Sequence, residues 1–142
     1  MARLSPAPLI CALIACTGCS APETDVRVSA LTLNDAPPTA AMRAGYLTLT
    51  NPGDQPRRLV SVASNGFGLA EIHRTETVDG VARMREIKDL TIAPGQTLNF
   101  EPFGRHVMLM RPSAPKTPDE DVTVTLCFDN EQCVVASAER TP

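Results

Sequence analysis

Two histidines and two methionines in this chain have the residue types and the spacing of a soft-metal site. They are His73, Met84, His106 and Met108, separated in order by ten, twenty-one and one intervening residues. Imidazole nitrogen combined with neutral thioether sulfur is a poor ligand set for zinc, calcium or magnesium. It suits monovalent copper, which is a soft ion of low charge. The four residues therefore predict a Cu(I) site.

Their positions predict two pairs that each share a sheet face. Asp79-Gly80, between two strand-like runs, is a typical two-residue hairpin turn, and it would place Thr75 opposite Met84. His73 lies two residues from Thr75, so it points to the same face as Met84 and is its diagonal neighbour. The second histidine and methionine are also two residues apart on one expected strand. Whether the two faces meet depends on the fold.

The surrounding sequence favours an all-β domain. With 142 residues the chain has room for one domain. Short apolar or alternating runs stand between turn sequences, and we see no convincing helix or internal repeat. We expect an extended run at residues 26–33 and strands at residues 46–50, 58–63, 69–77, 81–87, 98–100, 106–110, 122–128 and 133–138. Roughly seven to nine short strands of this kind predict a Greek-key β-sandwich or barrel.

Composition excludes several classes of function. The net charge is -3, aromatic residues make up 4% of the chain, and Lys and Arg form no basic run, so nucleic acid is not an expected partner. No Gly-rich phosphate loop is present and both histidines are candidate ligands, so we do not expect an enzyme. Blue-copper electron transfer needs a Cys thiolate beside two His. The spacing of Cys127 and Cys133 from His106 does not match that pattern.

The first residues predict export and a lipid anchor. Arg3 precedes an apolar stretch at residues 9–15 that is too short to span a bilayer. Leu13-Ile14-Ala15-Cys16 resembles a bacterial lipobox, so we predict a signal peptide at residues 1–15 and acylation of Cys16. Cys19 is the competing site, and Leu13 three residues before Cys16 favours the first. An ordinary secretory signal is the alternative.

Both readings of the N-terminus place the domain outside the cytoplasm. We expect a flexible tether at residues 16–25, which are small, polar and proline-containing, and a β domain at residues 26–142. The expected location is the periplasm or cell envelope. The expected contact with the membrane is through the lipid anchor only.

Cys127 and Cys133 flank the turn of the last expected hairpin. A three-residue loop at residues 129–131 would place the two cysteines opposite each other. Outside the cytoplasm such a pair predicts a disulfide, provided that the Cα atoms come within about 7 Å. A dithiol that binds copper or exchanges disulfides is the alternative.

The chain resembles the periplasmic copper chaperones called PCu(A)C over residues 26–139. The ligand spacing matches that family without a gap, and four surrounding blocks look like its corresponding stretches, at residues 45–51, 71–73, 83–85 and 106–110. The resemblance implies a cupredoxin-like β-barrel that binds one Cu(I) near its surface through His73, Met84, His106 and Met108. It also implies copper supply to the copper-site subunit of cytochrome c oxidase, often alongside Sco-type proteins.

Some features depart from the family pattern. Phe103-Gly104-Arg105 replaces a more Gly-rich approach to His106, and the two cysteines of the last hairpin are not part of the pattern. Met110 lies two residues after Met108 on the same expected strand, so it shares a face with His106 and Met108 and is either a spare ligand or core packing.

We favour an extracytoplasmic Cu(I) carrier. The alternatives are a module that buffers copper without delivering it and a thiol-disulfide oxidoreductase using Cys127 and Cys133.

Overall fold

The computed structural model describes residues 25–37, 40–113 and 117–139. Those residues form short strands and one 3-10 helix. The elements are β1 (Arg27–Val28), β2 (Thr32–Leu33), β3 (Met42–Tyr46), β4 (Thr48–Thr50), β5 (Arg57–Ser64), β6 (Phe67–Val78), β7 (Val81–Glu86), β8 (Thr91–Ile92), β9 (Thr97–Asn99), β10 (Arg105–Pro112), η1 (Asp119–Asp121), β11 (Thr123–Phe128) and β12 (Cys133–Ser137). Within these ranges no helix is long and apolar enough to cross a membrane.

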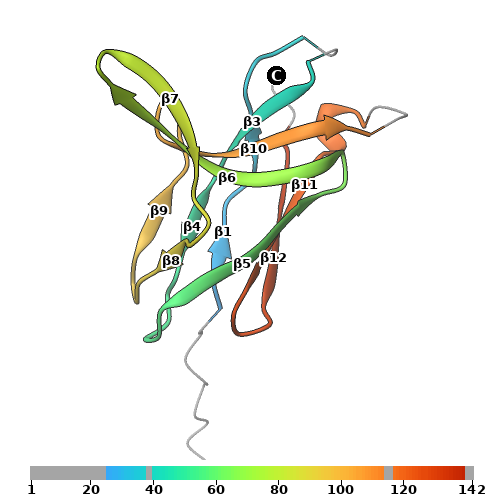
Figure 1. Cartoon of the computed structure of the whole chain (residues 1–142). Coiled ribbons are helices and arrows are strands. Elements are labelled where there is room, and N and C mark those ends of the chain that lie inside the picture. The colour runs from blue at the N-terminus through green and yellow to red at the C-terminus, as the bar shows by residue number, and fades with distance from the viewer. Residues whose placement is uncertain (1–24, 38–39, 114–116, 140–142) are drawn as a thin grey trace, which may run out of the picture.

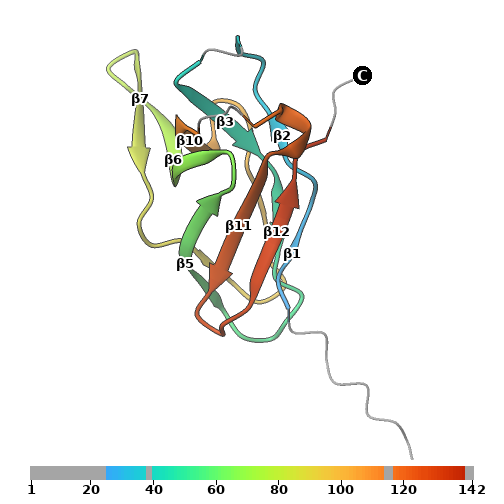
Figure 2. The same ribbon diagram turned by 90° about the vertical axis from the view of Figure 1, so that its right-hand side faces the viewer.

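The strands form three antiparallel sheets. Their orders are β1-β4-β9, β2-β3-β10-β6-β7 and β12-β11-β5-β8. The sheets pack around one core of aliphatic side chains and phenylalanines. Figures 1 and 2 show how the strands are arranged around it. The prediction of an all-β domain is therefore confirmed.

The five-stranded sheet carries the candidate ligands, and β10 is its central strand. Val107 and Leu109 on β10 are fully buried in the core, together with Ile72 on β6. Since side chains alternate along a strand, the residues between them point to the outer face of this sheet. That outer face is the one on which His73 and His106 lie.

Several strands differ from the sequence-based prediction. The run at residues 46–50 is divided at Leu47, where the chain leaves β3 in the five-stranded sheet and enters β4 in the three-stranded sheet. The extended run expected at residues 26–33 is divided into β1 and β2, which have two residues each. Strand β8 also has two residues, which is too short to show a periodic pattern. The structure therefore has more strands than expected.

The two ends of the sandwich carry different elements. Val26, at the start of β1, exchanges hydrogen bonds with the side chain of Gln132 in the β11–β12 turn, at 2.8 and 2.9 Å. Ribbon β6–β7 projects from the other end of the molecule (Figures 1 and 2). The chain therefore enters the domain far from this ribbon.

The last hairpin has the predicted geometry. Phe128 and Gln132 are joined by a backbone hydrogen bond across a three-residue loop, in which Glu131 has a φ of 65°. Cys127 and Cys133 are directly paired in the ladder and form a disulfide, with their Cα atoms 4.0 Å apart. This disulfide joins β11 to β12, in a different sheet from the two histidines.

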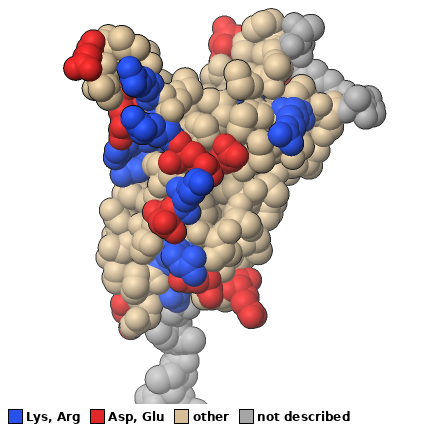
Figure 3. Space-filling model, in the orientation of Figure 1, with Lys and Arg blue, Asp and Glu red and all other residues tan. Residues whose placement is uncertain are grey.

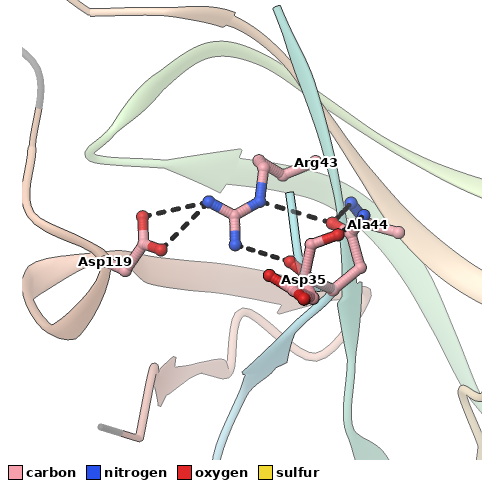
Figure 4. A network of polar contacts seen from close by, with 5 residues as sticks. Asp35, Arg43, Ala44 and Asp119 are labelled. Carbon is pink, nitrogen blue, oxygen red and sulfur yellow. Dashed lines mark hydrogen bonds and ion pairs between the residues drawn. The ribbon is translucent and has the colours of Figure 1, made fainter. Parts of the chain in front are cut away.

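The buried side chain of Arg43 anchors β3, which lies next to the edge strand β2 in the sheet of the candidate site. The guanidinium of Arg43 donates to both carboxylate oxygens of Asp119 in η1, at 3.0 and 3.1 Å. It also donates to the backbone oxygen of Asn34 at 2.6 Å. Figure 4 shows the guanidinium of Arg43 facing Asp119. A buried charge is tolerated when it is paired and hydrogen-bonded. The network therefore holds β3 against the segment that follows β2.

We expect Asp119→Ala to lower the free energy of unfolding by about 1–2 kcal/mol, because it removes the ionised partner of a buried guanidinium. The measurement is urea unfolding followed by circular dichroism. Asp121→Ala in the same turn is the matched control, since its side chain takes no part in the Arg43 network. Equal midpoints for the two variants would contradict the expected role of Asp119.

Candidate metal centre

The hairpin that carries Met84 has the expected register. Asp79 and Gly80 have φ values of 52° and 75°, as a two-residue turn of this type requires. Val78 pairs with Val81, and Thr75 lies opposite Met84. The prediction that His73 and Met84 are diagonal neighbours on one face is therefore confirmed.

Pairing of β10 with β6 brings the second pair to the first. His106 lies directly opposite His73, and Met108 lies directly opposite Glu71. The centroids of the two imidazole rings are 6.0 Å apart. Directly opposed residues of an antiparallel pair share a face. The fold thus supplies the convergence that the sequence alone left open.

The orientation of His106 is fixed by a backbone carbonyl. Its Nδ1 lies 3.2 Å from the oxygen of Gly104, and a carbonyl oxygen only accepts, so Nδ1 is the donor. The lone pair of this imidazole is then on Nε2. That nitrogen is buried and has no hydrogen-bond partner.

The orientation of His73 is fixed by a carboxylate. Its Nε2 lies 2.9 Å from Oε2 of Glu71, and an ionised carboxylate only accepts, so Nε2 is the donor. The lone pair of His73 is therefore on Nδ1, which is also buried and without a partner. A carboxylate or carbonyl behind a histidine is the arrangement that fixes the tautomer of metal-binding imidazoles.

These two nitrogens are unusual within the structure. Among the described residues, three buried side-chain nitrogen or oxygen atoms lack a hydrogen-bond partner, and two of them are His73 Nδ1 and His106 Nε2. A buried lone pair without a partner is destabilising, and it calls for an explanation such as a bound ion. Since each metal–imidazole bond is about 2 Å long, rings 6.0 Å apart can share one ion.

Two nitrogens do not complete a metal site. In the ranges that the structure describes, no three His, Cys, Asp or Glu side chains come together as a metal cluster. Glu71 is hydrogen-bonded to His73, and the same sheet face also offers the thioether sulfurs of Met84 and Met108. Met108 is 8% exposed and lies two residues from His106 on that face.

Met84 is placed differently from the other three candidates. Every residue of β7 is exposed, and the Met84 side chain is 60% exposed. It lies on the projecting ribbon, on the face that also carries His73. The structure therefore holds three candidates within the central strands and leaves the fourth at the solvent edge.

The loop before His106 supports the site through its backbone. The oxygen of Gly104 accepts from the backbone nitrogen of Thr75 at 3.1 Å as well as from His106. Phe103 has a φ of 62° and its side chain is 90% exposed. Despite its departure from the Gly-rich pattern, this loop therefore turns tightly and joins β10 to the ribbon beside Met84.

The arginines of the ribbon lie on the face away from the candidate ligands, whereas Glu86 lies opposite His73 on the site face. Arg74 pairs across the ladder with Arg85, and Glu76 pairs with Arg83, so all four alternate with His73, Thr75 and Met84. Figure 3 shows acidic and basic groups interleaved in this region. The hydrogen bond and charge of Arg74 hold the pKa of Glu76 below its ordinary value. The arginines are therefore neutralised on the face away from the candidate ligands.

Sequence reasoning missed Glu71 and Gly104. Glu71 lies two residues before His73 on the same strand, so the sequence already indicated that the two side chains share a face. Gly104 acts through its carbonyl, and no side-chain pattern indicates such a role.

Burial lowers the pKa of His106 below its ordinary value of 6.5. The hydrogen bond to Gly104 opposes this shift, and a charge on His73 would add to it. The neutral imidazole, which is the form that binds a metal, is therefore favoured.

Fold and site together define an antiparallel β-sandwich with a centre of two oriented imidazoles, bordered by thioethers, on the outer face of one sheet. The model of the LpqE-like lipoprotein family matches residues 24–139. The chain belongs to this family, and its domain is of the PCu(A)C type, which confirms the family predicted from the sequence.

Curated relatives match part of the chain. A Leifsonia xyli protein named as a lipoprotein, Lxx21020, is 32% identical over 92 residues, which are 64% of this chain and 55% of the relative. The protein RP573 of Rickettsia prowazekii is 32% identical over 94 residues, 65% of this chain and 52% of the relative. The chain spans about half the length of the curated relatives it matches.

Solved structures match most of the domain. Apo-DR1885 from Deinococcus radiodurans is 31% identical with a TM-score of 0.58, and the match covers 99% of this chain and 97% of that one. The copper-bound PCuAC domain from PmoF2 has a TM-score of 0.63 at 21% identity, covering 82% and 93% of the two chains. The second likeness shows the fold alone. Both agree with the predicted cupredoxin-like architecture.

We expect the metal-free protein to lose stability as the pH falls below about 6.5, because the unfolded chain then protonates its histidines while buried His106 stays neutral. The unfolded state binds more protons between the two pKa values, so the free energy of unfolding rises with pH across that window. Urea unfolding at a series of pH values measures this slope, and His106→Gln should flatten it. An NMR titration midpoint for His106 at or above 6.5 contradicts the argument.

Proposed function

We propose that this protein binds one Cu(I) ion through His73, Met84, His106 and Met108 and carries it outside the cytoplasm to a copper acceptor. The observation that carries the proposal is the pair of buried, partnerless imidazole nitrogens on directly opposed strands. Thioethers on the same face make the donor set soft and neutral, which favours a monovalent ion. The relative DR1885 has also been solved in a form named CuI-DR1885, at 32% identity to this chain.

The four residues have different roles in this proposal. His73 and His106 are held by Glu71 and Gly104, so their nitrogens are oriented before the ion arrives. Met84 is exposed, so it is the ligand that an acceptor thiolate replaces first. Because a thioether carries no charge, its replacement leaves no anion to be solvated. Transfer then proceeds from the solvent edge inward, and the imidazoles release last.

The proposed acceptors are the copper-site subunit of cytochrome c oxidase and Sco-type proteins, as the family resemblance implies. The proposed location is the periplasm or cell envelope, with the chain anchored through a lipid on Cys16 after removal of residues 1–15. The signal peptide, Cys16, Cys19 and the tether up to residue 24 lie outside the described residues. The lipoprotein names of the family and of the Leifsonia relative support the anchor.

A structural role for the Cys127–Cys133 disulfide is the interpretation we adopt over an oxidoreductase. The bond closes the β11–β12 hairpin, and the histidines lie in another sheet. No feature of the described residues next to the disulfide favours thiol exchange.

Cu(I) affinity, measured by anaerobic competition with a colorimetric chelator, tests the donor set. We expect Met84→Leu to weaken binding, since it removes a ligand and keeps the side-chain volume. Val81→Ala, exposed on the same strand, is the matched control and should leave affinity unchanged. Equal affinities for the wild type and Met84→Leu count against the proposal.

The same titration tests the positioning of His73. Glu71→Ala should lower Cu(I) affinity about 10- to 100-fold, the usual effect of removing the carboxylate behind a ligating histidine. Glu76→Gln is the control, because Glu76 lies five residues further along β6 and on its opposite face. No loss in Glu71→Ala would show that the carboxylate does not orient the ring.

Delivery is tested by mixing the copper-loaded protein with an isolated oxidase copper-site domain and measuring copper in each after separation. We expect copper to move to the acceptor, because exposed Met84 offers an attacking thiolate an open route. A chelator loaded to the same free Cu(I) concentration is the control. Retention of all copper by the protein would support the buffering alternative.

A further inference from the structure

All four methionines of the described residues project from one face of one sheet. Met42 on β3 lies directly opposite Met110 on β10. Met108 and Met110 alternate with the buried Val107 and Leu109, so they share the outer face with His106. Met84, opposite Thr75, belongs to that face too. Methionine commonly fills cores, yet no described methionine lies on the core face of this sheet.

Met42 and Met110 form a pair that the ligand spacing does not include. Cβ atoms of directly opposed residues are roughly 4.5–5.5 Å apart, which places the two thioethers within reach of each other. Met42 is 57% exposed and Met110 is half-buried. Packing alone gives no reason for an exposed methionine at this position.

The pair is continuous with the proposed copper centre. Met108 lies between Met110 and His106 along β10, and it is nearly buried. Three thioethers therefore run from solvent at Met42, through Met110 and Met108, to the oriented histidines. The first step is a cross-strand pair, and the next two steps join residues two apart on β10.

Uncharged side chains flank the pair on both sides. Leu69 lies opposite Met110 on β6, and Ala44 lies opposite Met108 on β3. The guanidinium of Arg43 points to the other side of β3, where it binds Asp119. Glu71 lies opposite Met108, but its carboxylate is hydrogen-bonded to His73. At Met42 and Met110 the donors are thioether sulfurs, which favour soft monovalent ions over hard divalent ions.

We propose that Met42 and Met110 form a second thioether site for soft monovalent ions such as Cu(I) or Ag(I), which shares Met108 with the histidine centre. The site goes beyond the proposed function and depends on it only for the destination of the ion. Without an imidazole ligand, it binds more weakly than the centre at His73 and His106. It therefore fills second, or holds an ion briefly on its way along β10.

The test is NMR of the full chain with 13C-labelled methionine methyl groups, titrated with Ag(I). Cys11, Cys16 and Cys19 are replaced by Ser, so that thioethers are the sulfur ligands left outside the disulfide. The first equivalent should shift the signals of Met84 and Met108. The second should shift those of Met42 and Met110. Circular dichroism verifies that each variant is folded.

Variants separate this site from the proposed centre. Met42→Leu combined with Met110→Leu should lose the second response and keep the first. Met84→Leu should leave the Met42 and Met110 responses intact. Unmoved Met42 and Met110 signals at two equivalents, with Met84 and Met108 shifted, would overturn the second site and leave the proposed function standing. Shifts at Met42, Met110 and Met108 with an unmoved Met84 signal would support the second site and contradict the ligand set of the proposed function.

Discussion

Pairing of β10 with β6 is the interaction on which the metal centre depends. The register places His106 opposite His73 and Met108 opposite Glu71. Because side chains alternate with a period of two, a slip by one residue would turn one histidine to the core and leave the other outside. The register is set by burial: Val107, Leu109 and Ile72 are all core residues, so a slipped strand would bring them to solvent. Core packing on one face thus fixes the metal chemistry on the other.

Hydrogen bonds to Glu71 and to the Gly104 carbonyl orient the two imidazole rings. Glu71 and the Gly104 carbonyl each accept one imidazole N–H, and this choice of tautomer leaves the remaining lone pairs buried and without partners. Leaving those lone pairs unpaired destabilises the metal-free protein, since each buried group without a partner costs about 1–3 kcal/mol. Because the imidazole rings are already oriented, they need little reorganisation when an ion binds. The exposed Met84 provides the contrast, since it remains open to exchange.

Local features of the sequence predicted the parts of the structure that depend on neighbours along the chain. Asp79-Gly80 determined the β6–β7 register, and the loop at residues 129–131 placed Cys127 opposite Cys133, because turn chemistry acts over a few residues. The β6–β10 pairing joins segments far apart in sequence, and no local pattern encodes it. For that reason the convergence of the two ligand pairs could be stated only through a family resemblance.

The division at Leu47 was missed because an alternating run has the same sequence pattern whether or not the chain passes from one sheet to another. Burial of Arg43 was missed because its partners, Asn34 and Asp119, lie in distant loops.

The hydrogen bonds between Val26 and Gln132 fix the point at which the chain enters the domain. They hold the beginning of the domain at the β11–β12 end, opposite the projecting ribbon (Figure 1). In a chain tethered to a bilayer by its N-terminal cysteine, the attachment point would therefore lie at the end opposite the ribbon and Met84. The attachment itself would then not obstruct the approach of proteins from the aqueous compartment to the exchangeable thioether.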